Sequence, residues 1–211
     1  MTASLELGKT SRGFGKGTFA DAKKQECSIQ DSSLATEAAI WFGVEDANPQ
    51  ILVGDTLQPV PPPVKPIPIS GWPGLTHDIL INTRMHLTIR MTKTLIRNFE
   101  KYLATGTVRK RTFVDRYGCE ASIRLTDGLI ELGCDNPNPQ ICDNGWRPVK
   151  YPDGTIFNIH MFLGREEVEG LLPHMKRFAE GGYVRQDDPE PGDLPVPLCE
   201  TPEQQSVSAA G

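Results

Sequence analysis

The fold is decided by the stretch NTRMHLTIRMTKTLIRNFEKYLATGTV, residues 82–108, which recurs without a gap as NIHMFLGREEVEGLLPHMKRFAEGGYV, residues 158–184. Both stretches begin with a short alternating segment and continue with apolar residues at every third or fourth position, the spacing of an amphipathic helix. The apolar positions of the two stretches correspond: Leu95, Ile96, Phe99, Tyr102 and Leu103 match Leu171, Leu172, Met175, Phe178 and Ala179. Each stretch therefore predicts a strand that leads into a helix.

The first helix carries capping residues at both ends. Thr88 precedes the apolar stripe, where its hydroxyl can accept a hydrogen bond from a free backbone N–H. Gly106 follows the stripe, where many helices end on a residue with left-handed backbone angles. We therefore expect a helix bounded by these two residues.

Three further matches precede the helices, in the same order in both halves. Thr18-Phe19-Ala20-Asp21 matches Thr112-Phe113-Val114-Asp115, Ser28-Ile29 matches Ser122-Ile123, and Ile40-Trp41-Phe42-Gly43 matches Ile130-Glu131-Leu132-Gly133. The alternation of apolar and polar residues in these segments is typical of strands joined by hairpin turns. The predicted fold class is α+β: two tandem, pseudo-twofold-related units, each with a small antiparallel sheet and one C-terminal amphipathic helix.

Composition defines the boundaries of these two units. The first repeat is expected over residues 17–108, with a proline-rich loop at 57–74, and the second repeat over residues 109–184. Residues 1–16 are rich in glycine, so we expect a flexible leader there. Residues 185–211 are acidic, rich in proline and without an apolar period, so we expect a disordered tail.

Length and charge exclude several classes of protein. The 211 residues are 38% hydrophobic and carry a formal net charge of −5. The chain has no apolar run of about 18 residues, the length a membrane-spanning helix needs. Residues 1–17 hold no apolar segment followed by a cleavage site, so neither a secretory signal nor a membrane partner is predicted, and a cytoplasmic location is expected. Six acidic residues lie beyond position 186, and the chain before that point sums to +1.

The sequence contains no recognisable catalytic or metal-binding motif. It has four histidines: His77, His86, His160 and His174. None of them has the spacing of a metal site or of a nucleophile with its base. The five cysteines include no C-x-x-C pair, which argues against zinc. We therefore predict no catalytic residue, no metal and no cofactor, and we expect the chain not to be an enzyme.

A binding surface is predicted in the part of the first half that the second half abbreviates. The candidate residues combine hydroxyl groups, a carboxylate and an aromatic ring: Ser32, Ser33, Thr36, Glu37 and Trp41. Polar groups beside an aromatic ring are typical of ligand and protein contacts. The alternative is a turn rich in Ser and Thr that satisfies its own backbone.

Basic residues recur on the first predicted helix, opposite its apolar stripe. They are Arg90, Lys93, Arg97 and Lys101, with Arg84 and His86 just before the helix. Such a strip could bind phosphate groups. A solvated helix face is the favoured interpretation, because Glu100 interrupts the strip. We keep Arg84, His86, Arg90 and Arg97 as candidates for ligand or partner binding.

The string ECSIQDSSLATE at residues 26–37, with IWFG at 40–43 and NTRMHLT at 82–88, resembles a group of small uncharacterised bacteriophage and prophage proteins. The second half is similar to the same group in FVDRYG at 113–118 and REEV at 165–168. The resemblance implies a phage origin, and hence the cytoplasm of a host cell. It implies no activity and no catalytic residues.

These observations lead to one preferred function and two alternatives. The preferred function is that of a non-enzymatic phage accessory protein that binds a host protein or a small anionic signal and so antagonises host defence. A nucleic-acid-binding regulatory protein, resting on the basic helix, is the second. A small hydrolase or transferase that pairs His86 with Ser32 or Ser33 is the third. The sequence allows a homo-oligomer and does not identify the partner.

Overall fold

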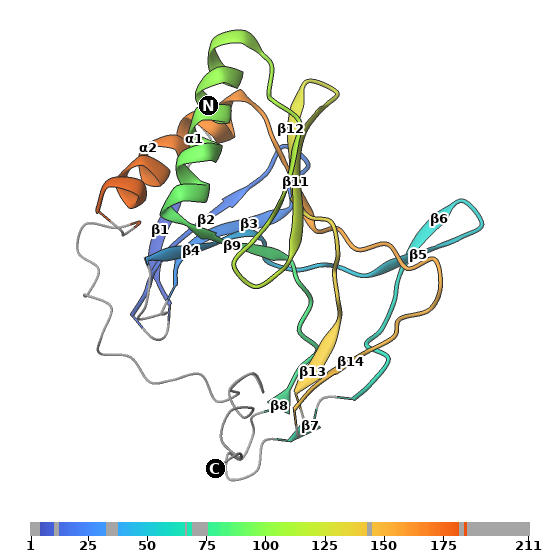
Figure 1. Cartoon of the computed structure of the whole chain (residues 1–211). Coiled ribbons are helices and arrows are strands. Elements are labelled where there is room, and N and C mark those ends of the chain that lie inside the picture. The colour runs from blue at the N-terminus through green and yellow to red at the C-terminus, as the bar shows by residue number, and fades with distance from the viewer. Residues whose placement is uncertain are drawn as a thin grey trace, which may run out of the picture. The chain divides into compact units, whose positions relative to one another are not determined.

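The computed structural model describes residues 5–10, 13–32, 38–65, 67–68, 76–142, 145–181 and 184. These residues form two compact units. Of the described residues, the first unit takes those up to Ala47, then Asn82–Pro137, and then those from Asn158 to Val184. The second takes Asn48–Ile81 and Asn138–Phe157. The fold is α+β, with two helices and several small antiparallel sheets (Figure 1).

The first unit contains a five-stranded antiparallel sheet in the order β1-β2-β3-β4-β9. Its strands are β1 (Glu6–Lys9), β2 (Gly15–Ala20), β3 (Glu26–Asp31), β4 (Ala39–Val44) and β9 (Arg84–Thr88). Residues alternate between the two faces of a strand, and one face is apolar and buried, with Ile29 opposite Phe42 and Phe42 opposite Met85. Helix α1 (Ile89–Thr105) follows β9 directly.

A four-stranded antiparallel sheet in the order β10-β11-β12-β15 belongs to the same unit. Its strands are β10 (Arg111–Val114), β11 (Glu120–Thr126), β12 (Leu129–Cys134) and β15 (His160–Leu163). Helix α2 (Arg165–Gly181) follows β15 as α1 follows β9. The strand order of this sheet matches that of β2-β3-β4-β9.

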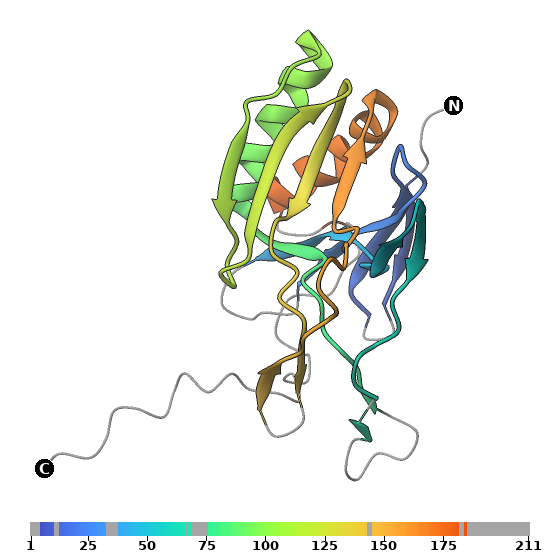
Figure 2. The same cartoon turned by 90° about the vertical axis from the view of Figure 1, so that its right-hand side faces the viewer.

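The two helices pack against each other, and Figure 2 shows them on one face of the four-stranded sheet. Tyr102 of α1 reaches that sheet, because its hydroxyl donates a hydrogen bond to the carbonyl oxygen of Gly128 over 2.8 Å. Beyond α2 the chain returns to the five-stranded sheet, where the backbone N–H of Val184 donates to Asp31 Oδ1 over 2.9 Å. Both sheets and both helices therefore belong to one compact unit.

The predicted ends of the first helix are confirmed. Thr88 is the N-cap, and its Oγ1 accepts a hydrogen bond from the backbone N–H of Met91. Gly106 has a φ of 68°, the left-handed conformation that glycine adopts without a steric penalty, and its N–H donates to the carbonyl of Tyr102. The helix therefore begins and ends at the residues that the sequence indicates.

The second unit consists of two-stranded ladders. They pair β5 (Gln50–Val53) with β6 (Thr56–Pro59), β7 (Ile67–Pro68) with β8 (Thr76–His77), and β13 (Gln140–Cys142) with β14 (Trp146–Pro148). Isolated bridges join Gln50 to Ile156 and Leu80 to Gln140. This unit therefore combines two excursions from the sheets of the first unit: the segment Asn48–Ile81, which follows β4, and the shorter segment Asn138–Phe157, which follows β12.

The structure differs from the sequence prediction in how it divides the chain. Residues 6–9, expected in a flexible leader, form the edge strand β1, which pairs with β2, and β2 itself begins at Gly15. The compact units are not separated at residue 108, because both sheets belong to the first unit and the excursions form the second. The proline-rich loop of residues 57–74 holds part of β6 and the short β7. The expected tail at 185–211 lies outside the described residues.

Candidate functional site

The second face of the five-stranded sheet is polar, and we call it the polar face. Two cross-strand rows make it up: Lys16, Gln30, Trp41 and His86 in one, and Thr18, Ser28, Gly43 and Arg84 in the other. Directly opposed residues share a face of the sheet. Side chains from four strands are thus collected on one surface, away from the apolar core.

Three rings form an aromatic cluster on this face: Trp41, His86 and Tyr117. The rings of Trp41 and Tyr117 are stacked, with centroids 5.5 Å apart and planes only 8° from parallel. The His86 ring lies 4.5 Å from Trp41 and 4.8 Å from Tyr117 and is tilted to both. His86 is fully buried, whereas 57% of the Tyr117 surface is exposed. The cluster therefore exposes the Tyr117 ring to solvent, while the His86 ring that it contacts is buried.

Tyr117 reaches the polar face because the β10–β11 turn docks on the edge strand β9. The buried Asp115 carboxylate organises this turn: Oδ1 accepts hydrogen bonds of 2.8 Å from the N–H groups of Tyr117 and Cys119. Its Oδ2 accepts from the N–H of His86 over 2.9 Å. Gly118 supplies the positive φ of the turn. The position of the Tyr117 ring is thus fixed by hydrogen bonds to two segments of backbone.

Asp21 plays the same part in the β2–β3 turn. Its Oδ1 accepts hydrogen bonds from the N–H groups of Lys23 and Gln25, at 2.9 and 2.8 Å. Its Oδ2 accepts from the N–H of Phe162 on β15 over 2.9 Å. Each hairpin turn therefore docks on the edge strand of the other sheet, and Lys23 lies over the Phe162 ring as Tyr117 lies over His86.

The charged groups of the polar face meet at Glu45. Lys16 Nζ lies 2.8 Å and Arg84 Nη1 3.5 Å from its carboxylate, and the Ser28 hydroxyl donates to it. Burial alone would raise the pKa of Glu45, but the hydrogen bonds from Lys16 and Ser28, together with the positive charges of Arg84 and Lys16, outweigh burial and lower it. Arg84 also donates to Gln30 Oε1 over 3.3 Å. Two cations thus share one carboxylate, which leaves this group of side chains with a net positive charge.

His86 lies within hydrogen-bond distance of a hydroxyl. Its Nε2 is 2.8 Å from Ser32 Oγ, while its buried Nδ1 has no hydrogen-bond partner among the described residues. Burial, with a smaller contribution from the positive charge of Arg116, lowers the pKa of His86 to about 4. His86 is therefore neutral at pH 7.

This pKa predicts a loss of stability in mild acid. The unfolded chain takes up a proton on His86 near its ordinary pKa of about 6.5, whereas the folded protein does so only near 4. Protonation thus favours the unfolded state, and we expect a decrease of about 2 kcal/mol in the free energy of unfolding between pH 6.5 and pH 5. Urea unfolding across this range measures the decrease.

The control is His86→Phe, which places on β9 the residue type that Phe162 supplies at the matching position of β15. This variant keeps a ring in the cluster and removes the titrating group. Its stability is expected to vary less with pH than that of the wild type over the same range. An unchanged pH dependence would show that other groups cause it.

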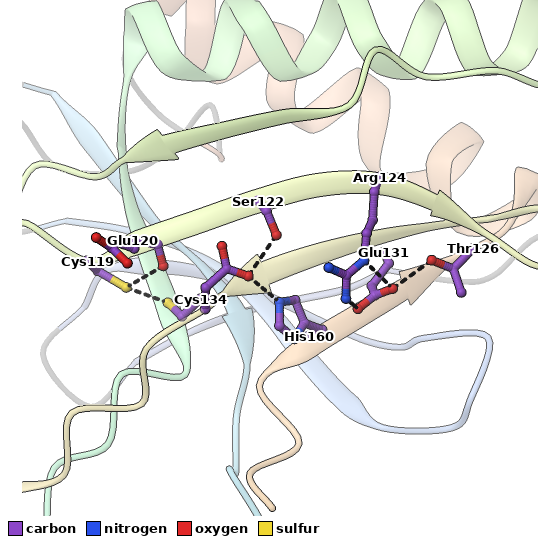
Figure 3. A network of polar contacts seen from close by, with 9 residues as sticks. Cys119, Glu120, Ser122, Arg124, Thr126, Glu131, Cys134 and His160 are labelled. Atoms are coloured by element: carbon purple, nitrogen blue, oxygen red, sulfur yellow. Dashed lines mark hydrogen bonds and ion pairs between the residues drawn. The ribbon is translucent and has the colours of Figure 1, made fainter.

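The polar face of the four-stranded sheet carries a different network (Figure 3). Asp135 Oδ1 accepts a hydrogen bond of 2.7 Å from Ser122 and lies 3.1 Å from His160 Nε2. Glu131 pairs with Arg124, which lowers the pKa of its carboxyl group. Asp135, Ser122 and His160 occupy the positions that correspond to Glu45, Ser28 and Arg84. Glu131 and Arg124 occupy those that correspond to Trp41 and Gln30. The aromatic cluster therefore has no counterpart here, because Glu131 stands where Trp41 stands on the other sheet.

The structure brings part of the predicted site together. Ser32, Trp41 and His86 are in contact, and Arg84 lies on the same polar face. The other two basic candidates lie on the exposed side of α1, where Arg90 is exposed and Arg97 donates to Thr94 Oγ1 over 3.0 Å. Three candidates lie outside the described residues: Ser33, Thr36 and Glu37.

Tyr117, Lys16, Gln30 and Glu45 were missed from the sequence. A signal for Tyr117 was present, because it follows Asp115 by two positions in a segment that matches the one around Asp21. That match does not reveal that the turn crosses to the other sheet. Glu45 and Lys16 are 29 residues apart, and only the strand pairing brings them together.

Comparison of the chain with protein-family models, with curated proteins and with solved structures finds no match. Within the described residues, no group of three or more His, Cys, Asp or Glu side chains is arranged to hold a metal ion. In the same part of the chain, no helix is both long and apolar enough to cross a membrane.

Proposed function

We propose that this protein acts by binding rather than by catalysis, and that the polar face of the five-stranded sheet is its binding surface. The observation that carries the proposal is the Tyr117 ring, which is 57% exposed although it is stacked on Trp41. Tyr, Trp and Arg side chains contribute most of the binding energy in many interfaces. All three residue types lie on or beside this face.

The rigidity of the cluster supports this proposal. Ordering a mobile side chain on binding costs roughly 0.5–1.5 kcal/mol. Tyr117 is already held by the stacked Trp41 ring and by the Asp115 turn. A ligand that packs on the ring therefore meets a surface that is largely ordered before it arrives.

The contact between Ser32 and His86 favours a hydrolase or transferase as a second candidate, because a nucleophile and its base must lie within hydrogen-bond distance. Two observations make it the weaker one. With a pKa of about 4, His86 is a poor proton acceptor at neutral pH. In addition, no carboxylate among the described residues accepts a hydrogen bond from His86 Nδ1. In a catalytic triad the aspartate orients the histidine in this way.

We also propose that the two sheets arose by duplication of one unit and are related by a pseudo-twofold axis. The shared strand order and the reciprocal docking of Asp21 and Asp115 support this. Among the residues that the structure describes, the exposed aromatic surface is present on one of the two sheets. Tyr117 and Trp41 correspond to Lys23 and Glu131, so we expect one binding surface per chain.

The wider role we propose is that of a phage accessory protein in the cytoplasm of its host. It would antagonise host defence by engaging a host protein or by sequestering a small anionic signal. The resemblance to phage proteins supports the setting, and the cations beside the cluster, Lys16 and Arg84, support an anionic ligand.

The test is retention of a host component that depends on Tyr117. Immobilised wild type, Tyr117→Ala and Val114→Ala are exposed in parallel to host lysate, and bound protein, nucleic acid and small molecules are analysed. Val114 is a matched control because it is 56% exposed and belongs to the same hairpin. We expect a component that the wild type and Val114→Ala retain and that Tyr117→Ala loses. Retention of nothing, or equally by all three proteins, would overturn the proposal.

A further inference from the structure

Two members of the aromatic cluster, His86 and Tyr117, lie near the two ends of a strongly basic part of the chain. Residues 84–117 contain nine Lys and Arg and two acidic residues, in a protein whose formal net charge is −5. Eight of these cations are exposed: Arg90, Lys93, Arg97, Lys101, Arg109, Lys110, Arg111 and Arg116. We call these eight residues the basic border.

The fold places the basic border along neighbouring elements of the first unit. Four of its cations recur about once per turn on α1, which rises about 5.4 Å per turn. The next three, at 109–111, follow the helix, and the N–H of Arg109 donates to Asn98 Oδ1 of α1 over 3.1 Å. Strand β10 then runs along the edge of the four-stranded sheet and ends at Val114 (Figure 2). Arg116 follows in the β10–β11 turn and directly precedes Tyr117.

The two acidic residues of this segment do not oppose the basic border. Glu100 is paired with Lys176 of α2 over 2.7 Å. Asp115 is buried, and its carboxylate accepts backbone hydrogen bonds within the turn. The interruption that Glu100 causes in the sequence is thus compensated by a cation from the second helix.

We propose that the ligand of this surface is a single-stranded nucleic acid, whose phosphates follow the basic border and one of whose bases stacks on Tyr117. This inference rests on the binding surface of the proposed function, and it takes a nucleic acid as the ligand in place of a host protein or a small anionic signal. Phosphate contacts by Lys and Arg supply most of the affinity for nucleic acid, and an exposed aromatic ring binds bases of any sequence. A duplex would present its phosphates but not an unstacked base.

An acidic protein could also bind the cations, but two observations favour nucleic acid. The cations are spread over a helix, a connection and an edge strand, as a long, regularly charged ligand requires. The exposed Tyr117 ring follows the last of these cations, and its plane is only 8° from parallel to that of the Trp41 ring. A base that stacks on Tyr117 would therefore extend an existing stack. A protein partner is the other outcome of the test below.

The test is fluorescence anisotropy of the whole protein with labelled 20-nucleotide single strands of DNA and RNA and with a DNA duplex, over a series of salt concentrations. We expect single strands to bind at least about tenfold more tightly than the duplex, with an affinity that falls steeply with salt. Arg90→Gln combined with Arg97→Gln should reduce the slope of log K against log salt by about 1.4, since each phosphate contact contributes about 0.7. Tyr117→Ala should weaken binding by about tenfold without changing this slope.

Two further proteins serve as controls. Lys65→Gln combined with Lys150→Gln removes two exposed cations of the second unit and should change neither affinity nor slope. Tyr117→Phe keeps the ring and should recover most of the affinity that Tyr117→Ala loses, because stacking needs the ring rather than the hydroxyl. Absence of binding, binding that salt does not weaken, or equal affinity for the duplex would overturn the inference. If lysate retention depends on Tyr117 but yields only protein, the binding surface stands and the nucleic acid does not.

Discussion

Replacing Gly133 by alanine is expected to cost about 4 kcal/mol or more of folding stability, a large part of the roughly 5–15 kcal/mol that stabilises a typical domain. A Cβ atom at this position would lie 2.7 Å from the Cα of His160 and closer still to the carbonyl oxygen of Ile159. Both are backbone atoms, so no side-chain rotation relieves the clash. Strand β15 would have to move away from β12, which carries its hydrogen bonds.

Gly43 gives the same prediction for the five-stranded sheet. A Cβ there would lie 2.7 Å from the Cα of Arg84 and would also clash with the carbonyl oxygen of Thr83. The matched control is Gly8→Ala on β1, whose nearest neighbour would be 4.0 Å away. Urea unfolding and expression level compare the three variants. A loss of less than about 1 kcal/mol at Gly43 or Gly133 would contradict the prediction. It would show that the neighbouring strand can shift to accommodate the added Cβ atom at little cost.

The periodic parts of the fold could be predicted from the sequence. The apolar stripe of residues 95–103 identified α1, and Thr88 and Gly106 gave its ends, because helix caps depend on local backbone geometry. The alternating segments around Ile123 and Leu132 identified two neighbouring strands, which pair in the structure. These features need only residues that are close in sequence.

The features that depend on distant contacts could not be predicted in this way. Pairing of residues 6–9 with β2 is invisible in a short, glycine-rich segment, because a single edge strand has little pattern of its own. The candidate site was predicted around Trp41 and His86, but the exposed ring comes from Tyr117, which is 31 residues along the chain from His86. The docking of Asp115 on β9 determines this contact, and no local pattern states which strand a turn will meet.

Asp115→Ala is expected to lower stability by about 3–5 kcal/mol and to abolish binding at the polar face. The change leaves three backbone N–H groups without their acceptor, those of His86, Tyr117 and Cys119. An unsatisfied buried donor costs about 1–3 kcal/mol, and water can replace the acceptor where the turn is exposed. Without the carboxylate the turn separates from β9, and the Tyr117 ring loses its fixed position on Trp41.

Asp21→Ala separates these two effects. Its carboxylate accepts the same kinds of hydrogen bond, from Lys23, Gln25 and Phe162, so the loss of stability should be similar. It organises the opposite turn, however, and leaves the docking of Tyr117 intact. At a temperature where both variants are folded, Asp21→Ala should bind the ligand as the wild type does, and Asp115→Ala should not. Urea unfolding and ligand titration on the same samples measure both quantities, and equal loss of binding in the two variants would mean that stability, rather than the Tyr117 turn, controls the site.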